Sequence, residues 1–456
     1  MNIYINVEIS IRELDGNLLL AVLAAAKGHQ VIVSDSEGII KGINSGVLVP
    51  GIFHTKSLTP AEHKIARHEA LVEKDFIITS IDEEAGLDVL GFQEFAITRF
   101  SDKTIDQATA LFGWGPSDTD TLKKLYHRHS SKIHKTGSPR SDLWKSLFRD
   151  YWGMPKKAPE KPFLLVSSNM FGANGIVPFH EIIKSKRAFG YYERDKGLLK
   201  KEFIRTGEAY FKTEAFTAAI KYLALNGNGY DIVLRPHPTE DIEAWKIYLE
   251  GVPNVHVIQE GSISGWVQNA FAVMHCNCTT ALEATISNKP VVTYDSFKQT
   301  YYADAPPNKL GYLVKSREEL LNKVNTLFDE MRSGNQKNIS EKDTEEVSLK
   351  VYIDNNELAA EKIVKVWDSL ARDDHSRSSN WTKFHWLLKA IKFRKMFGKI
   401  LRGLLQGKFG SYKNNNKFPA LNSHDINERV NRLQRILGIK GLKFKLLSDR
   451  TLLIKR

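Results

Sequence analysis

The chain has 456 residues, with 65 Lys and Arg against 53 Asp and Glu, so its formal net charge at pH 7 is +12. This length suffices for two domains with their own hydrophobic cores and a further segment. The two cysteines, Cys276 and Cys278, are too closely tethered for an ordinary disulfide, which excludes a disulfide-stapled scaffold and favours a reducing cytoplasm. The N-terminus has no signal-peptide pattern, and no run of about 18 uncharged apolar residues occurs, so we expect neither secretion nor a membrane-spanning helix.

The N-terminal part of the chain alternates between strand-like and helix-like patterns. A strand at 2–8, an apolar helix at 14–29 and a strand at 30–35 form a first β-α-β unit. Alternation of this kind predicts a doubly wound parallel sheet. The next elements are expected at 46–51 (GVLVPG), at 60–74 as a charged helix, at 75–82 (DFIITSID), at 94–100 (EFAITRF) and at 102–111 as a helix.

A Lys- and Pro-rich stretch at 155–162 is typical of a linker to a second sheet. That sheet is expected to begin with KPFLLVSSNM, and a helix at 206–226 then leads to the strand YDIVL and the turn RPHP. We predict an α/β chain with two Rossmann-like doubly wound domains facing a cleft. The expected boundaries are 1–154 for the N-terminal domain, 155–162 for the linker, 163–370 for the C-terminal domain and 371–456 for a basic amphipathic extension.

Two turns of the second sheet carry side chains suited to a phosphate. In an open parallel sheet, ligands bind beyond the carboxyl ends of the strands, where a helix N-terminus offers free N–H groups. A strand-end His and the hydroxyls that open the helix ALEATISN could hold a phosphate there, and Glu283 on an exposed first turn could reach a ribose. Each residue alone is more typical of a plain N-cap or a hydrogen-bonded turn, so the hypothesis depends on their combination. The candidate donor-binding residues of this sheet are Ser168, Arg235, His237, Pro238, Asn277, Thr279, Thr280 and Glu283.

An acidic loop, Asp82 to Glu84, follows the strand FIITSI of the first sheet. A carboxylate at a strand end could accept a proton from a hydroxyl or stabilise a cationic transition state, but it could equally cap a helix N-terminus. Arg140, in the turn TGSPR, could bind a carboxylate of the ligand bidentately, or it could pair with Asp142 in a purely structural turn. No metal site is expected, because the pair Asp118 and Asp120 lies in a polar loop rather than at a strand end.

The segments RPHP and CNCTTALEATISNKPVVTY resemble the C-terminal domain of GT-B glycosyltransferases that use CMP-activated acidic sugars, in which an HP motif and a Ser/Thr pair hold the CMP. SIDEEAGL (80–87) and TGSPRSDLW (136–144) are similar to bacterial surface carbohydrate biosynthesis proteins, relatives of the capsule Kdo transferases. The resemblance covers about residues 1–370 in motif order. It implies the GT-B fold, with 1–154 as the acceptor domain and 163–370 as the nucleotide-sugar-binding domain. It implies that the acidic loop supplies the catalytic carboxylate, Glu83 first and Asp82 second, with His237 as a further catalytic candidate.

The C-terminal tail is strongly basic. From Trp381 to Arg456 there are 19 Lys and Arg against 3 Asp and Glu, a balance of +16, so the other 380 residues carry +12 − 16 = −4. Apolar residues recur at helical spacing among the basic ones in this tail. Such a helix could lie on an anionic membrane, or it could pack its apolar face on the protein body; a nucleic-acid partner is less favoured, because no recognition motif accompanies the charge.

These patterns predict a cytoplasmic glycosyltransferase at the inner face of the cell membrane. It would move an acidic sugar of the Kdo or nonulosonate type from a CMP donor onto a surface polysaccharide or glycolipid, without a cofactor or a metal ion. The alternatives are a polyol-phosphate transferase that uses CDP-glycerol or CDP-ribitol and a non-catalytic GT-B scaffold in polysaccharide assembly.

Overall fold

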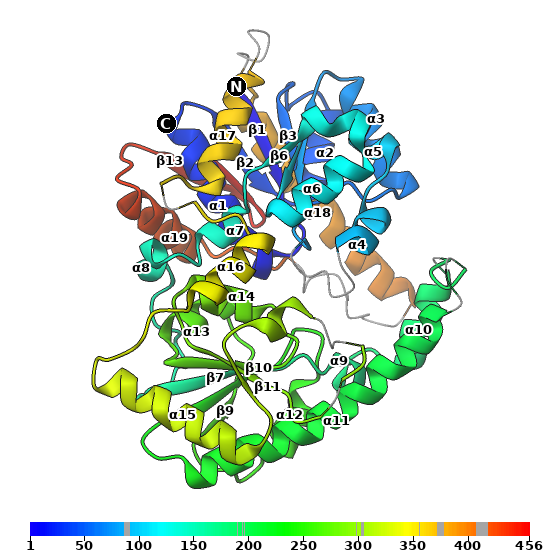
Figure 1. Ribbon diagram of the computed structural model, residues 1–456. Coiled ribbons are helices and arrows are strands. Elements are labelled where there is room, and N and C mark those ends of the chain that lie inside the picture. The colour runs from blue at the N-terminus through cyan, green and yellow to red at the C-terminus, as the bar shows by residue number, and fades with distance from the viewer. Residues whose placement is uncertain are drawn as a thin grey trace. The chain divides into compact units, whose positions relative to one another are not determined.

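The computed structural model describes residues 1–456 except 86–91, 189, 194, 196, 298, 302–304, 355, 372–377 and 407–417, and it leaves the side chains of 398–406 undescribed. The end of the motif SIDEEAGL and parts of the expected extension therefore lie outside the described residues. The chain divides into two compact units: unit 1 comprises Met1–Leu143 and Ser348–Arg456, and unit 2 comprises Trp144–Val347. Each unit is built on one parallel-rich sheet (Figure 1), which confirms the predicted α/β class with two Rossmann-like sheets.

The sheet of unit 1 has eight strands in the order β13-β14-β2-β1-β3-β4-β5-β6. The chain order reverses between β1 and β3, which is the topological switch point of this sheet. The strands β1 to β6 pair in parallel, whereas the hairpin β13-β14 joins β2 antiparallel. The strands are β1 (Asn2–Asn6), β2 (Gln30–Ser34), β3 (Ile52–Thr55), β4 (Ile77–Ile81), β5 (Ala110–Gly113), β6 (Ile133–Lys135), β13 (Lys443–Ser448) and β14 (Thr451–Lys455).

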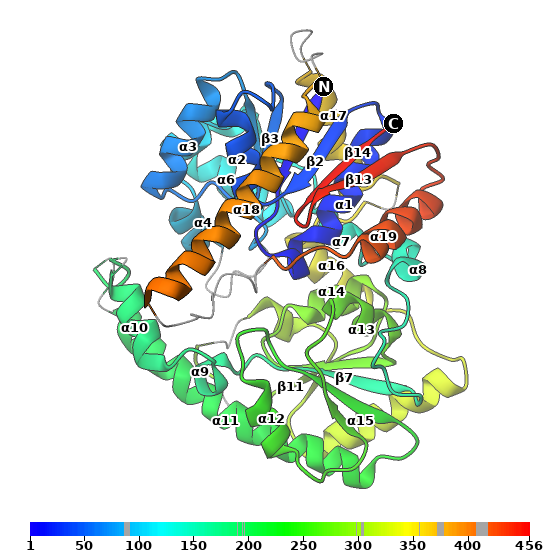
Figure 2. The same cartoon turned by 180° about the vertical axis from the view of Figure 1, so that it is seen from behind.

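Helices cover the sheet of unit 1. Helices α7, α17 and α19 pack around α1, while α18 lies against α2 and β13, where Figure 2 shows it as a long diagonal helix. The helices are α1 (Ser10–Ala26), α2 (Ser36–Asn44), α3 (Glu62–Val72), α4 (Phe92–Arg99), α5 (Asp102–Asp106), α6 (Pro116–Leu125), α7 (Pro139–Asp142), α17 (Ala359–Ser369), α18 (Trp381–Gln406) and α19 (Ser423–Ile436).

Two sequence-based assignments in unit 1 are wrong. The segment GVLVPG (46–51) is a turn, and the strand is the following β3. The segment EFAITRF belongs to helix α4, in which Phe92 and Ala96 are buried at a spacing of four residues, which is the helical period. The helix expected at 102–111 ends at Asp106, and its last residues instead begin strand β5.

The C-terminal residues return to unit 1, which differs from the expected boundaries at 154, 162 and 370. Helix α17 was expected in the second domain, but the Asp142 carboxylate accepts hydrogen bonds from the N–H groups of Ala359 (3.0 Å) and Ala360 (2.9 Å) at its N-terminus. Its Trp367 is fully buried against His54 of β3, with ring centroids 5.2 Å apart. The end of the expected basic extension forms β13 and β14, and consecutive residues of TLLIK pair antiparallel with β2.

The sheet of unit 2 has six parallel strands in the order β12-β11-β10-β7-β8-β9, and its switch point lies between β7 and β10. Helices α11 and α15 lie on one face and α13 and α14 on the other (Figure 1). The strands are β7 (Phe163–Ser167), β8 (Asp231–Arg235), β9 (Val255–Val257), β10 (Ala272–His275), β11 (Val291–Tyr294) and β12 (Tyr312–Val314). The helices are α8 (Arg149–Trp152), α9 (Phe171–Asn174), α10 (Phe179–Ala188), α11 (Gly197–Asn226), α12 (Ile242–Tyr248), α13 (Ile263–Asn269), α14 (Thr280–Ile286) and α15 (Arg317–Arg332), with α16 (Glu341–Lys350) at the boundary between the units.

The expected strands before the turn RPHP and on both sides of the helix ALEATISN are confirmed. YDIVL contributes β8, AFAVMHC contributes β10, and VVTY is β11. Apolar side chains of these strands are fully buried between the helical layers, as the continuous apolar runs require for a parallel sheet. The strand ends are thereby fixed, and the polar residues that follow them are held at one edge of the sheet.

Candidate functional site

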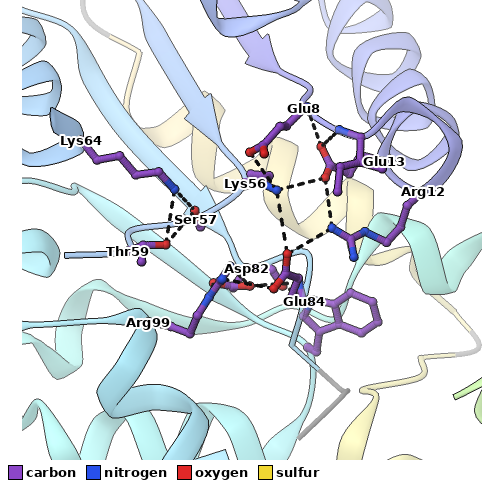
Figure 3. Close-up of polar contacts among 12 residues, drawn as sticks. Glu8, Arg12, Glu13, Lys56, Ser57, Thr59, Lys64, Asp82, Glu84 and Arg99 are labelled. Carbon is purple, nitrogen blue, oxygen red and sulfur yellow. Dashed lines mark hydrogen bonds and ion pairs between the residues drawn. The ribbon is translucent and has the colours of Figure 1, made fainter. Parts of the chain in front are cut away.

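In unit 1, charged side chains gather at the switch point of the sheet (Figure 3). Glu8 follows β1, Lys56 follows β3, and the acidic loop follows β4. The Lys56 ammonium lies 2.9 Å from the Glu8 carboxylate, 3.5 Å from Glu13 and 4.0 Å from Glu84. Because parallel strands end at the same edge, three strands deliver their polar residues to one place.

Glu13 also fixes the first turn of α1. Its Oε2 accepts hydrogen bonds from the backbone N–H groups of Glu8 (2.7 Å) and Ile9 (3.1 Å). The buried carboxylate thus satisfies donors that a helix N-terminus leaves open. Arg12, one residue earlier, contacts Glu13 at 3.4 Å and Glu84 at 3.3 Å, which links the helix to the acidic loop.

Asp82 is bound by Arg99 of α4. The guanidinium Nε and Nη2 lie 2.8 and 2.9 Å from the two carboxylate oxygens, and Nη1 lies 3.2 Å from Glu84. Burial raises the pKa of Asp82, and the charge of Arg99 opposes that shift. A carboxylate whose two oxygens are engaged in this way orients the loop, so Asp82 is the weaker of the two catalytic candidates.

Glu83 is different, because its carboxyl group is buried beside other charges. The residue is 5% exposed, and among the described residues no hydrogen-bond partner is found for its Oε2. Burial raises the pKa of Glu83 from 4.5 to about 8; the nearby Glu13 adds to this effect, while Arg140 and Arg12 oppose it. A carboxyl group that titrates near pH 8 is suited to accept or donate a proton in a reaction at neutral pH.

Arg140 lies near this carboxyl, at the start of α7. The backbone of Arg140 is packed closely against α1, since a Cβ on Gly16 would lie 3.0 Å from its nitrogen. Arg140 is therefore a charged neighbour of Glu83 in unit 1, not a group of the sheet that carries the other donor-binding candidates.

In unit 2, the two strands at the switch point are joined by side-chain hydrogen bonds. The Asn169 side chain, after β7, donates to the carbonyl of Asn277, after β10, at 2.8 Å. Asn277 has a φ of +59°, a left-handed conformation that Asn tolerates better than most residues. Its backbone N–H donates to Asn308 at 2.8 Å and its side chain to Gln299 at 2.5 Å. Asn277 thus holds the turn before α14 in a defined shape.

Hydroxyl and thiol groups lie under this turn. The Thr280 hydroxyl is 3.1 Å from that of Ser167 and 3.2 Å from the Cys278 sulfur. Thr280 is 7% exposed, whereas Thr279 is half-buried at the start of the helix. Both cysteines are buried free thiols, and burial raises the pKa of Cys276 to about 12, so it stays protonated.

The turn after β8 presents His237 and orients it. The backbone N–H of Thr239 donates to His237 Nδ1 at 3.3 Å, which leaves the proton of the neutral imidazole on Nε2. Pro238 is exposed. Arg235 has another role, because its guanidinium donates to the carbonyls of Glu260 (2.5 Å) and Gly261 (2.8 Å) and lies over the ring of Trp266. Arg235 therefore holds the loop after β9.

Glu240 ties this turn to β7. Its carboxylate accepts hydrogen bonds of 2.7 Å from the Ser168 hydroxyl, the Met170 N–H and the Trp245 indole. Burial raises the pKa of Glu240, and these donors oppose that shift. Ser168, a predicted donor-binding residue, thus has its hydroxyl proton committed to Glu240.

Helix α11 carries a row of buried charges toward this end of the sheet. Its inward stripe is apolar from Phe216 to Leu223 but continues toward the N-terminus with charged residues at spacings of three and four. Arg205 lies 4.4 Å from the centroid of the Phe171 ring, and the Glu208 carboxylate accepts from the N–H groups of Thr300 and Tyr301. The four charged residues are Glu202, Arg205, Glu208 and Lys212.

One expectation about the donor site is wrong. Glu283 was expected on an exposed first turn of α14, but it is 2% exposed, and six of the seven residues of that short helix are buried. Its contact with a ribose stays a prediction.

Sequence reasoning missed Glu8, Arg12, Glu13 and Lys56 in unit 1, and Glu240 and the α11 charges in unit 2. A signal existed for α11, because its charges continue the helical spacing of the apolar stripe. No comparable local signal marks Lys56, whose partners come from three other segments.

Two kinds of feature are absent from the described part of the chain. No group of three or more His, Cys, Asp and Glu side chains there is arranged to hold a metal ion. Of the helices described, none is both long and apolar enough to cross a membrane.

Comparison with known proteins gives distant likenesses. No family model matches the sequence, and no curated protein matches it. A putative UDP-N-acetylglucosamine 2-epimerase from Listeria monocytogenes aligns at 14% identity over 81% of this chain and 96% of its own, with a TM-score of 0.49. A glycosyltransferase from Rickettsia africae ESF-5 aligns at 12% identity over 82% and 98%, with a TM-score of 0.44. The wall teichoic acid polymerase TagF aligns at 11% identity over 71% and 73%, with a TM-score of 0.41. These TM-scores are below 0.5, so the fold assignment rests on the two sheets themselves.

Proposed function

We propose that the protein is a GT-B-type glycosyltransferase that moves an acidic sugar of the Kdo or nonulosonate type from a CMP donor to a surface polysaccharide or glycolipid. The observation that carries this proposal is Glu83, a buried carboxyl at the switch point of unit 1 whose pKa is raised to about 8. Structural carboxylates in the same loop are bound by Arg99, whereas Glu83 Oε2 has no hydrogen-bond partner among the described residues.

The chemistry requires such a group. When the acceptor hydroxyl attacks the anomeric carbon, the bond from that carbon to the phosphate oxygen breaks, its electron pair leaves with CMP, and the hydroxyl proton must be taken up. Glu83, once ionised, accepts that proton and is a stronger base than an ordinary carboxylate, because its pKa is higher. Arg12 and Arg140 supply positive charge near the ionised form.

Unit 2 is proposed to bind the donor at the switch point between β7 and β10. The support is that His237 follows β8 and that Asn277 and Thr280 both follow β10 of the same sheet. Thr239, Asn308 and Ser167 hold these three residues. Donors for the phosphate would come from His237 Nε2 and from the hydroxyls at the start of α14. Arg235 leaves the proposed contact set, because its guanidinium binds the carbonyls of the loop after β9.

The experiment compares donors directly. CMP release is measured with CMP-Kdo, CMP-N-acetylneuraminate and CDP-glycerol, each with and without a polysaccharide fragment. The proposal expects CMP from at least one CMP-sugar and no turnover of CDP-glycerol. Turnover of CDP-glycerol alone would establish the polyol-phosphate alternative, and a protein that binds CMP but releases it from no donor would be a scaffold.

The expected location of this reaction is the cytoplasmic face of the cell membrane, where a membrane-linked acceptor would be extended. This part of the proposal is independent of Glu83 and is argued from helix α18 below.

A further inference from the structure

Helix α18 has two apolar stripes on opposite sides, and the first is buried in unit 1. Phe384 is fully buried and Leu388 is 6% exposed. Both pack on α2 at its glycines: a Cβ on Gly42 would lie 2.7 Å from Phe384 Cε2, and one on Gly38 would lie 3.2 Å from Leu388 Cδ2. This stripe anchors the helix, as the packing alternative for the tail expects.

The second stripe is exposed. Trp386 and Phe393 are each 62% exposed, and Phe397 is 56% exposed. Phe393 follows Phe384, and Phe397 follows Leu388, by nine residues, which is about two and a half helical turns. The exposed aromatic residues therefore lie on the side of α18 that faces away from α2. Phe393 and Phe397 stack on one another with ring centroids 6.4 Å apart. We call Trp386, Phe393, Met396 and Phe397 the aromatic stripe.

Basic residues accompany the aromatic stripe. Between Trp381 and Phe397 there are five Lys and Arg residues and no Asp or Glu. Lys389 lies 4.7 Å from the centroid of the Trp386 ring, so it stands beside the stripe. Lys392 and Lys395 bind Asp449 and Glu37 of the protein body and help to fix the helix. The exposed side of α18 thus combines aromatic rings with positive charge.

We propose that the aromatic stripe docks on an anionic lipid bilayer, with its rings at the headgroup level and its basic neighbours against the lipid phosphates. Aromatic rings favour the membrane interface, and basic residues near it are attracted to anionic lipid. A second copy of the chain fits less well, because contact between two such helices would bring like charges together. The inference does not rest on the proposed reaction, but it would bring the enzyme to a membrane-linked acceptor.

The test is sedimentation of the full-length protein with vesicles of phosphatidylcholine alone or with phosphatidylglycerol. The wild type should bind the anionic vesicles at low salt and much less at high salt, because surface charges are screened over a Debye length of about 8–10 Å. The variant Trp386→Ser/Phe393→Ser/Phe397→Ser should bind at least tenfold more weakly, while its melting temperature and CMP affinity stay at the wild-type values.

A matched control replaces three apolar residues that are equally exposed elsewhere, as Leu225→Ser/Ile247→Ser/Leu313→Ser in unit 2. This control should bind vesicles like the wild type. Equal sedimentation of the aromatic-stripe variant and the wild type would overturn the proposal. So would light scattering that shows a wild-type dimer abolished by the same substitutions, since the stripe would then be covered by a second copy. A wild-type protein that binds the anionic vesicles but turns over no donor would count against the proposed function and leave the membrane proposal standing.

Discussion

Replacing Glu83 by Gln should change how stability depends on pH, and the sign is fixed by the direction of the pKa shift. Between pH 4.5 and about 8, the folded protein holds a proton on Glu83 that the unfolded chain has released. The free energy of unfolding of the wild type therefore falls as the pH rises through this window and stays low above it. Gln cannot ionise, so the free energy of unfolding of the Glu83→Gln variant does not fall in this way.

The size of the effect follows from the two pKa values. The difference between an ordinary pKa of 4.5 and a folded pKa of about 8 corresponds to on the order of 5 kcal/mol at full ionisation. The buried amide of Gln adds a cost of about 1–3 kcal/mol, which is independent of pH. The variant should accordingly be close to the wild type or less stable at pH 5, and more stable than the wild type at pH 9.

Urea unfolding of the intact chain at pH 5, 7 and 9 measures this change. Glu84→Gln is the matched control, one residue away. Burial raises the pKa of Glu84, but the charges of Arg99, Arg12 and Lys56 outweigh burial, and the pKa of Glu84 is lowered. The ionised Glu84 side chain therefore stabilises the protein above pH 4.5, and this contribution is lost in acid. Glu84→Gln should accordingly lower the free energy of unfolding slightly, by the same amount at each pH from 5 to 9. The same stability difference between Glu83→Gln and wild type at pH 5 and pH 9 would refute a raised pKa for Glu83.

Three further predictions test other parts of the account. His237→Ala and Thr280→Ala should each weaken CMP binding about ten- to hundredfold in calorimetry, since each removes a hydrogen bond to a charged phosphate; wild-type affinity in both would remove the donor site from this turn. Asp142→Ala should lower the free energy of unfolding by about 1–3 kcal/mol, because two N–H groups at the start of α17 lose their acceptor; Asp241→Ala, an exposed cap of α12, is the milder control. A chain that ends at Asn380 should unfold in unit 1 or aggregate, because it lacks β14 beside β2 and the buried Phe384; a stable truncated chain in denaturation experiments would show that the tail is dispensable.

Much of the fold could be predicted from local patterns. The strands β8, β10 and β11 are short apolar runs bounded by turn residues, and burial on both faces of a parallel sheet requires such runs. The acidic loop follows directly from the end of β4, so its place at the edge of the sheet could be predicted from the strand alone.

The sequence-based assignments are wrong where contacts with distant segments determine the local structure. EFAITRF has apolar residues compatible with either period, and its helix is supported by the ion pairs of Arg99 with Asp82 and Glu84. The hairpin β13-β14 depends on β2, more than 400 positions earlier in the chain, and its basic composition resembles a solvated tail. Strand pairing over such a separation leaves no periodic signal in the local sequence.

In the candidate site, too, some features could be predicted from the local sequence and others depend on distant contacts. The residue types at the strand ends could be predicted, but their hydrogen-bond partners could not, and these partners distinguish the two catalytic candidates. Asp82 and Glu83 are adjacent in the sequence and both buried, yet Arg99 binds both oxygens of Asp82, whereas Glu83 Oε2 has no hydrogen-bond partner among the described residues. For the tail, the two alternatives of packing and membrane contact now correspond to two different sides of α18.

The pH dependence of CMP formation tests the central claim most directly. With CMP-Kdo or CMP-N-acetylneuraminate as donor, kcat/KM of the wild type should rise about tenfold per pH unit and level off near pH 8, where Glu83 becomes ionised. At pH 8 and above, Glu83→Gln should lose about 10²- to 10⁴-fold in turnover and keep its CMP affinity, because the carboxylate acts in proton transfer rather than in binding. Near-normal turnover in Glu83→Gln, or a wild-type profile that is flat from pH 6 to 9, would contradict the assignment of Glu83 as the base.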